Sequence, residues 1–116
     1  MLATLGYVAL GGACGSVLRV LVGMAVAFPF GTLAVNVLGS FLIGVAWASG
    51  VDKVPGVFPF LMLGVLGGFT TFSTFSLDVL KLVEASQYGM SLLYVLASVV
   101  LSLAACAIGV YLVANS

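Results

Sequence analysis

Long apolar runs separated by short polar connections dominate this chain of 116 residues. Hydrophobic residues make up 64% of the chain and charged residues 5%, and the mean hydropathy is +1.41. A soluble domain of this size cannot bury so much apolar surface. One membrane-spanning helix needs about 20 apolar residues, so the length allows four spans and little else. We therefore expect an all-α integral membrane protein, with one transmembrane domain over residues 1–116.

Three turn-forming segments divide the chain into its predicted spans, namely Phe28–Gly31, Gly50–Gly56 and Ala85–Gly89. The spans are expected at about residues 2–27, 32–49, 57–84 and 90–114. Four spans place both chain ends and the Gly50–Gly56 connection on one side of the membrane.

The few basic residues give almost no preference for the direction of insertion. Lys53 lies on the side of the chain ends, whereas Arg19 and Lys81 lie near the other. Orientation follows the excess of Lys and Arg in cytoplasmic loops, and this count is nearly balanced. The balance fits a protein that inserts both ways, and it fits equally a chain that a partner orients.

The third apolar run contains a stretch that is poorly suited to a uniform helix. Gly67–Phe75 reads GGFTTFSTF, with two glycines, four hydroxyls and three aromatic rings in nine residues. A Gly-Gly pair costs a helix about 2 kcal/mol relative to Ala-Ala, and hydroxyls offer the freed backbone other partners. We expect a functional break here, in which Gly67–Thr70 leave helical geometry. The freed carbonyls would suit a small cation, and two breaks meeting in a two-fold dimer would supply four oxygens.

Arg19 is the only charged residue in the first 51 residues. The first span holds no carboxylate that could pair with it. An arginine that snorkels to the membrane surface is one interpretation. A fixed positive charge at the mouth of an anion path, or a pair with the distant Asp78, is another. Asp78 itself is expected on an interfacial helical turn, paired with Lys81.

Two other spans each present a polar stripe at four-residue spacing. The second span carries Thr32, Asn36, Ser40 and Gly44, and the fourth carries Tyr94, Ser98 and Ser102. A buried amide in lipid needs a hydrogen-bond partner. Asn36 therefore either joins helices or offers an N–H donor to a permeating anion, and the stripe alone favours neither.

Phe72 and Phe75 are three residues apart and share one helical face. The edge of a phenyl ring carries positive quadrupole density. Edge-on rings can therefore meet an anion without trapping it, which conduction requires. The alternative is that both rings face lipid or fill the core.

The residue types exclude several classes of function. The chain has no His and no CxxC motif, and Cys14 and Cys106 lie within apolar runs as small hydrophobic residues. No pair of nucleophile and base can be assembled, so an enzyme is not expected. The polar groups are mostly donors and the first two spans hold no acid, so the stripes suit an anion.

The chain resembles the Fluc (CrcB) fluoride channels of microbial membranes. Three blocks carry the resemblance: Gly11–Arg19, Gly31–Phe41 and Gly67–Phe75. The third block is highly specific, and the resemblance covers essentially the whole chain. It implies a dual-topology homodimer of antiparallel subunits with two fluoride pores.

The resemblance also implies a role for each matching residue. Residues of the fluoride pore would be Asn36, Phe72, Phe75, Ser73, Thr74, Tyr94, Ser98 and Ser102. Arg19 matches the family's arginine near the vestibule. The backbone carbonyls of Gly67 and Thr70 match those that hold a structural Na⁺ at the dimer interface. Asp78 sits where relatives carry an acidic residue, often Glu.

The expected function is a fluoride-selective channel of the cell membrane that exports fluoride passively and so confers fluoride resistance. A small multidrug-type exporter is an alternative, but such exporters need a glutamate in the first span, and none is present. A membrane scaffold that transports nothing is the other alternative, with its polar residues joining helices only.

Overall fold

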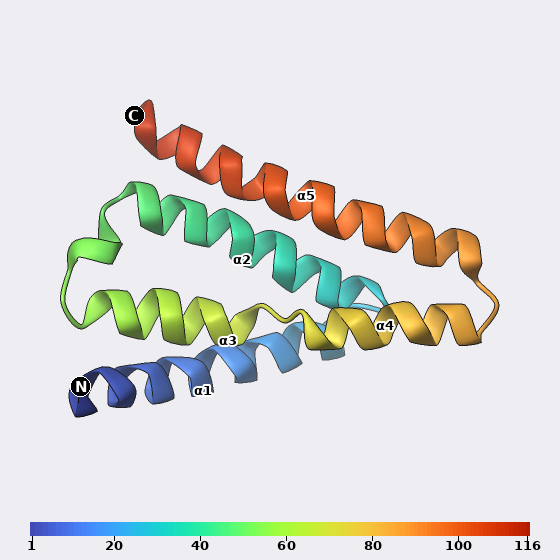
Figure 1. Ribbon diagram of the computed structural model, residues 1–116, viewed down its shortest axis with the longest axis horizontal. Coiled ribbons are helices and arrows are strands. Elements are labelled where there is room, and N and C mark those ends of the chain that lie inside the picture. The colour runs from blue at the N-terminus through green and yellow to red at the C-terminus, as the bar shows by residue number, and fades with distance from the viewer.

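A computed structural model describes all 116 residues. Four helices are long and apolar enough to cross a membrane: α1 (Leu2–Ala25), α2 (Phe30–Ala48), a third over Phe58–Glu84 and α5 (Tyr88–Ala114). They run up and down beside one another, with both chain ends at the same end of the molecule (Figure 1). The expected all-helical fold with four spans is thereby confirmed.

The third span consists of three helical pieces. A π-helix, η2 (Phe58–Leu66), continues into the short α3 (Gly67–Phe69), and α4 (Ser73–Glu84) follows after a gap. Between them Thr70 has an extended backbone, with φ −87° and ψ 155°. A short 3-10 helix, η1 (Val51–Lys53), lies in the loop that precedes the span.

The expectation that Gly67 and Gly68 themselves leave helical geometry is wrong. Both are helical, and the backbone departs at Thr70. The structure gives Gly68 a different use, because a Cβ there would lie 2.7 Å from the carbonyl oxygen of Gly12 in α1. A methyl group at this position cannot fit without moving one of the helices.

Glycines bring the helices together in two closely packed pairs. In the first pair Gly11 and Gly15 of α1 meet the backbone of η2 directly. In the second, Gly44 of α2 meets the carbonyl of Cys106, and Gly109 of α5 meets the backbone of α2. Small residues permit this approach, which van der Waals contact then stabilises in a lipid environment.

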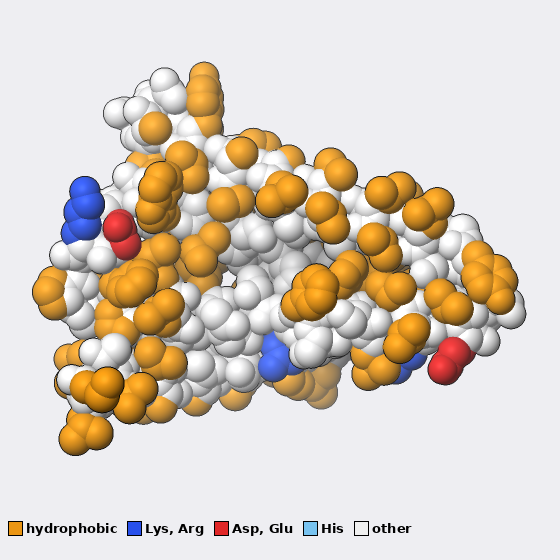
Figure 2. All heavy atoms as spheres, viewed as in Figure 1, with side chains coloured by type: hydrophobic (Ala, Val, Ile, Leu, Met, Phe, Trp, Pro, Cys, Tyr) orange, Lys and Arg blue, Asp and Glu red, His pale blue; other side chains and the backbone are white.

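Two small apolar clusters complete the interior. One centres on Ala46, Met62 and Leu66, and the other on Phe75 and Tyr94 with Leu82. Hydrophobic side chains are spread over the face shown in Figure 2, and a hollow lies near its middle. A protein that faces lipid can expose these side chains at no cost.

The two neighbouring glycines of α1 make a matched test of this packing. Gly11→Ala places a methyl group against η2, and we expect it to lower the free energy of unfolding by about 1–3 kcal/mol. Gly12→Ala meets nothing within 4 Å, so the better helix propensity of alanine should leave stability unchanged or raise it by up to about 1 kcal/mol. Thermal unfolding in detergent measures both, and equal melting temperatures would contradict the close contact.

Candidate functional site

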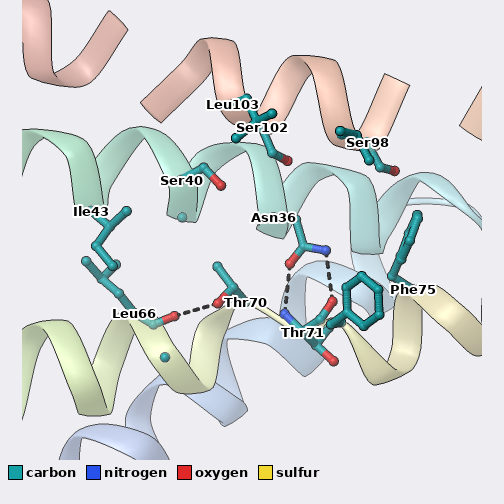
Figure 3. Close-up of a pocket in the computed structure, with 14 residues that line it drawn as sticks. Asn36, Ser40, Ile43, Leu66, Thr70, Thr71, Phe75, Ser98, Ser102 and Leu103 are labelled. Atoms are coloured by element: carbon teal, nitrogen blue, oxygen red, sulfur yellow. Dashed lines mark hydrogen bonds between the residues drawn. The ribbon is translucent and has the colours of Figure 1, made fainter. Parts of the chain in front are cut away.

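A cavity of about 630 Å³ opens between α2, α5 and the interrupted third span. Figure 3 shows polar side chains from these elements pointing toward it. Its lining consists of Asn36, Gly39, Ser40, Ile43, Leu66, Gly67, Thr70, Thr71, Phe72, Phe75, Ser98, Val99, Ser102 and Leu103. No charged side chain is among them.

Asn36 holds the interruption by two hydrogen bonds to one residue. Its Oδ1 accepts from the backbone N–H of Thr71 at 2.8 Å, and its Nδ2 donates to the carbonyl of Thr71 at 2.9 Å (Figure 3). Both backbone groups of Thr71 are thereby satisfied by a side chain of α2. The sequence left two interpretations open, a residue that joins helices and a donor to an anion. The contacts of Asn36 in this structure are those of a residue that joins helices.

Threonine hydroxyls satisfy the helix ends on either side. The Thr70 hydroxyl donates to the carbonyl of Leu66 at 3.0 Å, at the end of the first helical part. The Thr71 hydroxyl accepts from the N–H of Thr74 at 3.2 Å, in the first turn of α4. The Leu66 carbonyl also accepts from the backbone N–H of Thr70 at 3.1 Å, so the Thr70 hydroxyl adds a second bond there. The N–H of Thr74 belongs to the first turn of its helix, where such groups have no partner within the helix, and the Thr71 hydroxyl supplies one.

Arg19 does not pair with Asp78. Its Nε donates to the carbonyl of Gly68 at 3.1 Å, so the guanidinium lies at the carboxyl end of α3. A positive charge is favourable at this end of a helix. Arg19 also lines a second cavity of about 280 Å³, together with Thr32, Thr71 and Thr74.

The two phenylalanines lie close together in different surroundings. Their ring centroids are 5.5 Å apart and the rings are tilted by 50°. Phe72 is 77% exposed, whereas Phe75 is 8% exposed and packs against the ring of Tyr94 at 5.3 Å. Both line the larger cavity, which brings the rings next to the amide of Asn36.

Asp78 is the polar residue that the sequence placed wrongly. It is buried, at 4% exposure, and accepts a hydrogen bond from the hydroxyl of Tyr94 at 3.0 Å. It forms no ion pair with Lys81, whose Nζ lies 5.7 Å from the ring centroid of Phe28. Asp78 falls on the same helical stripe as the buried Phe75 and Leu82. That three- and four-residue spacing was the signal for an inward-facing position.

Of the remaining predicted site residues, two line the larger cavity and two line neither cavity. Ser98 and Ser102 of α5 line the larger one, and the Ser98 hydroxyl is buried without a hydrogen-bond partner. Tyr94 is buried beneath this cavity's Phe75 and turns its hydroxyl to Asp78. Ser73 lines neither cavity, and its hydroxyl lies 3.3 Å from that of Thr71.

These features define a small multi-pass membrane protein with an uncharged cavity beside an interrupted helix, where an amide and several hydroxyls lie among apolar side chains. The chain belongs to the CrcB family: the model of the CrcB-like protein, Camphor Resistance (CrcB), matches residues 6–110. The chain is 49% identical to a protein of Agrobacterium fabrum named fluoride-specific ion channel FluC, over 96% of each chain. It is 50% identical to one of the same name from Cereibacter sphaeroides, over 90% of this chain and 89% of that one.

The buried Asp78–Tyr94 bond yields a stability test. Tyr94→Phe leaves the Asp78 carboxyl buried without its partner, so we expect a loss of about 1–3 kcal/mol in the free energy of unfolding. The double variant Tyr94→Phe with Asp78→Leu should lose less free energy of unfolding than the two single variants lose in sum, because the pair acts as a unit.

The matched control is Tyr111→Phe, since Tyr111 is 65% exposed and its hydroxyl bonds no side chain. It should change stability by less than about 0.5 kcal/mol. Chemical denaturation in detergent measures all four variants. Strict additivity of Tyr94→Phe and Asp78→Leu would count against the bond.

Proposed function

We propose that this chain forms a fluoride-selective channel in the cell membrane, through which fluoride leaves the cytoplasm passively. The observation that carries the proposal is the larger cavity, which gathers an amide, hydroxyls and two phenyl rings and holds no charged side chain. The names of the relatives, fluoride-specific ion channel FluC, support the choice of ion.

Fluoride is small, and stripping its water in a dry medium costs on the order of 20 kcal/mol. A pore must replace that water with donors, yet bind weakly enough to release the ion. The unpartnered hydroxyl of Ser98 is one such donor. Ser102 lies on the same cavity, where the edges of Phe72 and Phe75 add positive quadrupole density.

Arg19 and the smaller cavity suit an entrance to this path. The Nε of Arg19 is bonded to Gly68, and its charge raises the local concentration of anions. Thr74 lines the entrance cavity. Ser73 and Tyr94 then act beside the path, Ser73 through its neighbour Thr71 and Tyr94 by supporting the ring of Phe75.

The functional unit in this proposal is an antiparallel homodimer. Phe72 is 77% exposed although it borders the larger cavity, and a second copy packed there would cover it. The near balance of Lys53 against Arg19 and Lys81 allows insertion in both directions. Two copies in opposite orientations would enclose two pores.

The dimer would hold a structural Na⁺ on backbone carbonyls. The chain fits this ion, because the N–H of Thr71 bonds Asn36 and therefore leaves the carbonyl of Gly67 without its usual partner four residues on. Gly67 and Thr70 both border the larger cavity. One chain would offer two carbonyl oxygens, which is too few for a hard cation, and two copies would supply four.

Fluoride efflux from liposomes tests the channel directly. The purified chain should release fluoride far faster than empty vesicles do. Phe75→Ile and the pair Ser98→Ala with Ser102→Ala should each lower the rate by about tenfold or more, because donors or ring edges are lost where the ion sheds water.

Phe30→Ile is the control, since this phenylalanine is 44% exposed and lies outside both cavities. Efflux equal to that of empty vesicles would refute the channel. Full flux in the Ser98 and Ser102 double variant would instead favour a pore that runs elsewhere or a scaffold.

Removing sodium tests the cation and the dimer together. Light scattering in detergent should give the mass of two chains when Na⁺ is present. Exchanging Na⁺ for N-methylglucamine should lower the melting temperature, because bound ligand stabilises the folded state by mass action. A melting temperature that does not depend on Na⁺, or a mass of one chain, would contradict this part of the proposal.

A further inference from the structure

We infer that Asn36 is a positioning residue, which acts on the permeating ion through the backbone of Thr71 rather than by binding the ion. The inference rests on the proposed channel function and assigns a role within that site. It starts from how the amide is already engaged: the single oxygen and one N–H of Asn36 bond the two backbone groups of Thr71, at 2.8 and 2.9 Å.

The pairing has the form of two residues in neighbouring antiparallel strands, which exchange both backbone bonds. Here a side chain of α2 takes the place of a second strand. In an unbroken helix the N–H of Thr71 would bond the carbonyl of Gly67. Thr70 prevents this with its extended backbone, and an unpaired peptide at membrane depth costs several kcal/mol. Asn36 therefore makes the interruption tolerable.

The same two bonds fix where the interruption lies. They are the only side-chain hydrogen bonds between α2 and the third span. On its other side Arg19 of α1 bonds the carbonyl of Gly68. Gly68, which lies three positions before Thr71, is thus bonded to α1. Thr71 itself is bonded to α2, which packs closely against α5.

Phe72 follows Thr71 directly and Phe75 lies three residues further, in the first turn of α4. A shift of the Thr71 peptide would displace both rings. It would also alter both cavities, because Thr71 borders each of them. Displacing a group by about 1 Å can lower a rate by about a hundredfold without removing any contact to the reacting species.

The test removes one hydrogen bond and leaves every side chain in place. In a semisynthetic full-length chain, Thr71 is replaced by its α-hydroxy-acid analogue, which turns the peptide N–H into an ester oxygen. The matched control is the same replacement at Ser49, whose N–H bonds the carbonyl of Val45 at 3.0 Å outside both cavities. Fluoride efflux is measured for both esters and for Asn36→Leu.

We expect the ester at Thr71 to lower efflux by about tenfold or more, and the ester at Ser49 to leave it unchanged. Asn36→Leu should lower efflux strongly in the chain with a natural backbone. In the chain that already carries the Thr71 ester, the same substitution should lower efflux much less. Wild-type efflux from the Thr71 ester, with efflux lost in Asn36→Leu, would overturn the inference and make Asn36 a direct ligand. If Asn36→Leu does not fold, the efflux of the Thr71 ester compared with that of the Ser49 ester still tests the inference.

A second readout separates this inference from the proposed function. Hydrogen exchange at the Thr71 amide should be slow in the natural chain and faster by about tenfold or more in Asn36→Leu. Unchanged protection would overturn the inference even if the chain conducts fluoride. Lost protection in a chain that does not conduct fluoride would leave the positioning role standing and refute the channel.

Discussion

A peptide group within lipid has no water to bond, and the interruption at residues 70–72 leaves several such groups without a partner in their own helix. Several of these groups are met by different neighbours. Asn36 of α2 takes both backbone groups of Thr71, Arg19 of α1 takes the carbonyl of Gly68, and the Thr71 hydroxyl takes the N–H of Thr74. The two cavities lie at this place, so the polar groups that permit the interruption also surround the candidate path.

Close backbone contact provides the frame for these bonds. The pair of α1 with η2 and the pair of α2 with α5 each approach through glycine, without intervening side chains. The buried apolar clusters between the pairs are small, with three buried residues in each. The larger cavity occupies the space that remains between the pairs. The pathway in our proposal thus follows from how few large residues face inward.

Hydropathy and turn residues were enough to predict the four spans, because the bilayer sets their length and excludes other folds. Asn36, Ser98 and Ser102 belong to the polar stripes of two spans and line one cavity, and their role in a pore stays a prediction. The role of Gly68 could not be predicted, because a glycine serves equally well in a bend or a contact. Arg19 bonds a backbone carbonyl. Every residue has such a group, so the residue types could not predict which one Arg19 would bond. Asp78 was misplaced because its nearness to Lys81 in the sequence outweighed the spacing of its buried neighbours.

Thr71 borders both cavities, so the two cavities meet at this residue. A peptide unit spans about 3.8 Å from one Cα to the next. Within our proposal water fills both cavities and conducts, so the transmembrane potential would fall mainly across the Thr71 peptide. One elementary charge that crosses the full potential gains about 2.3 kcal/mol per 100 mV. A permeating ion would therefore gain most of this electrical free energy over the length of a single residue.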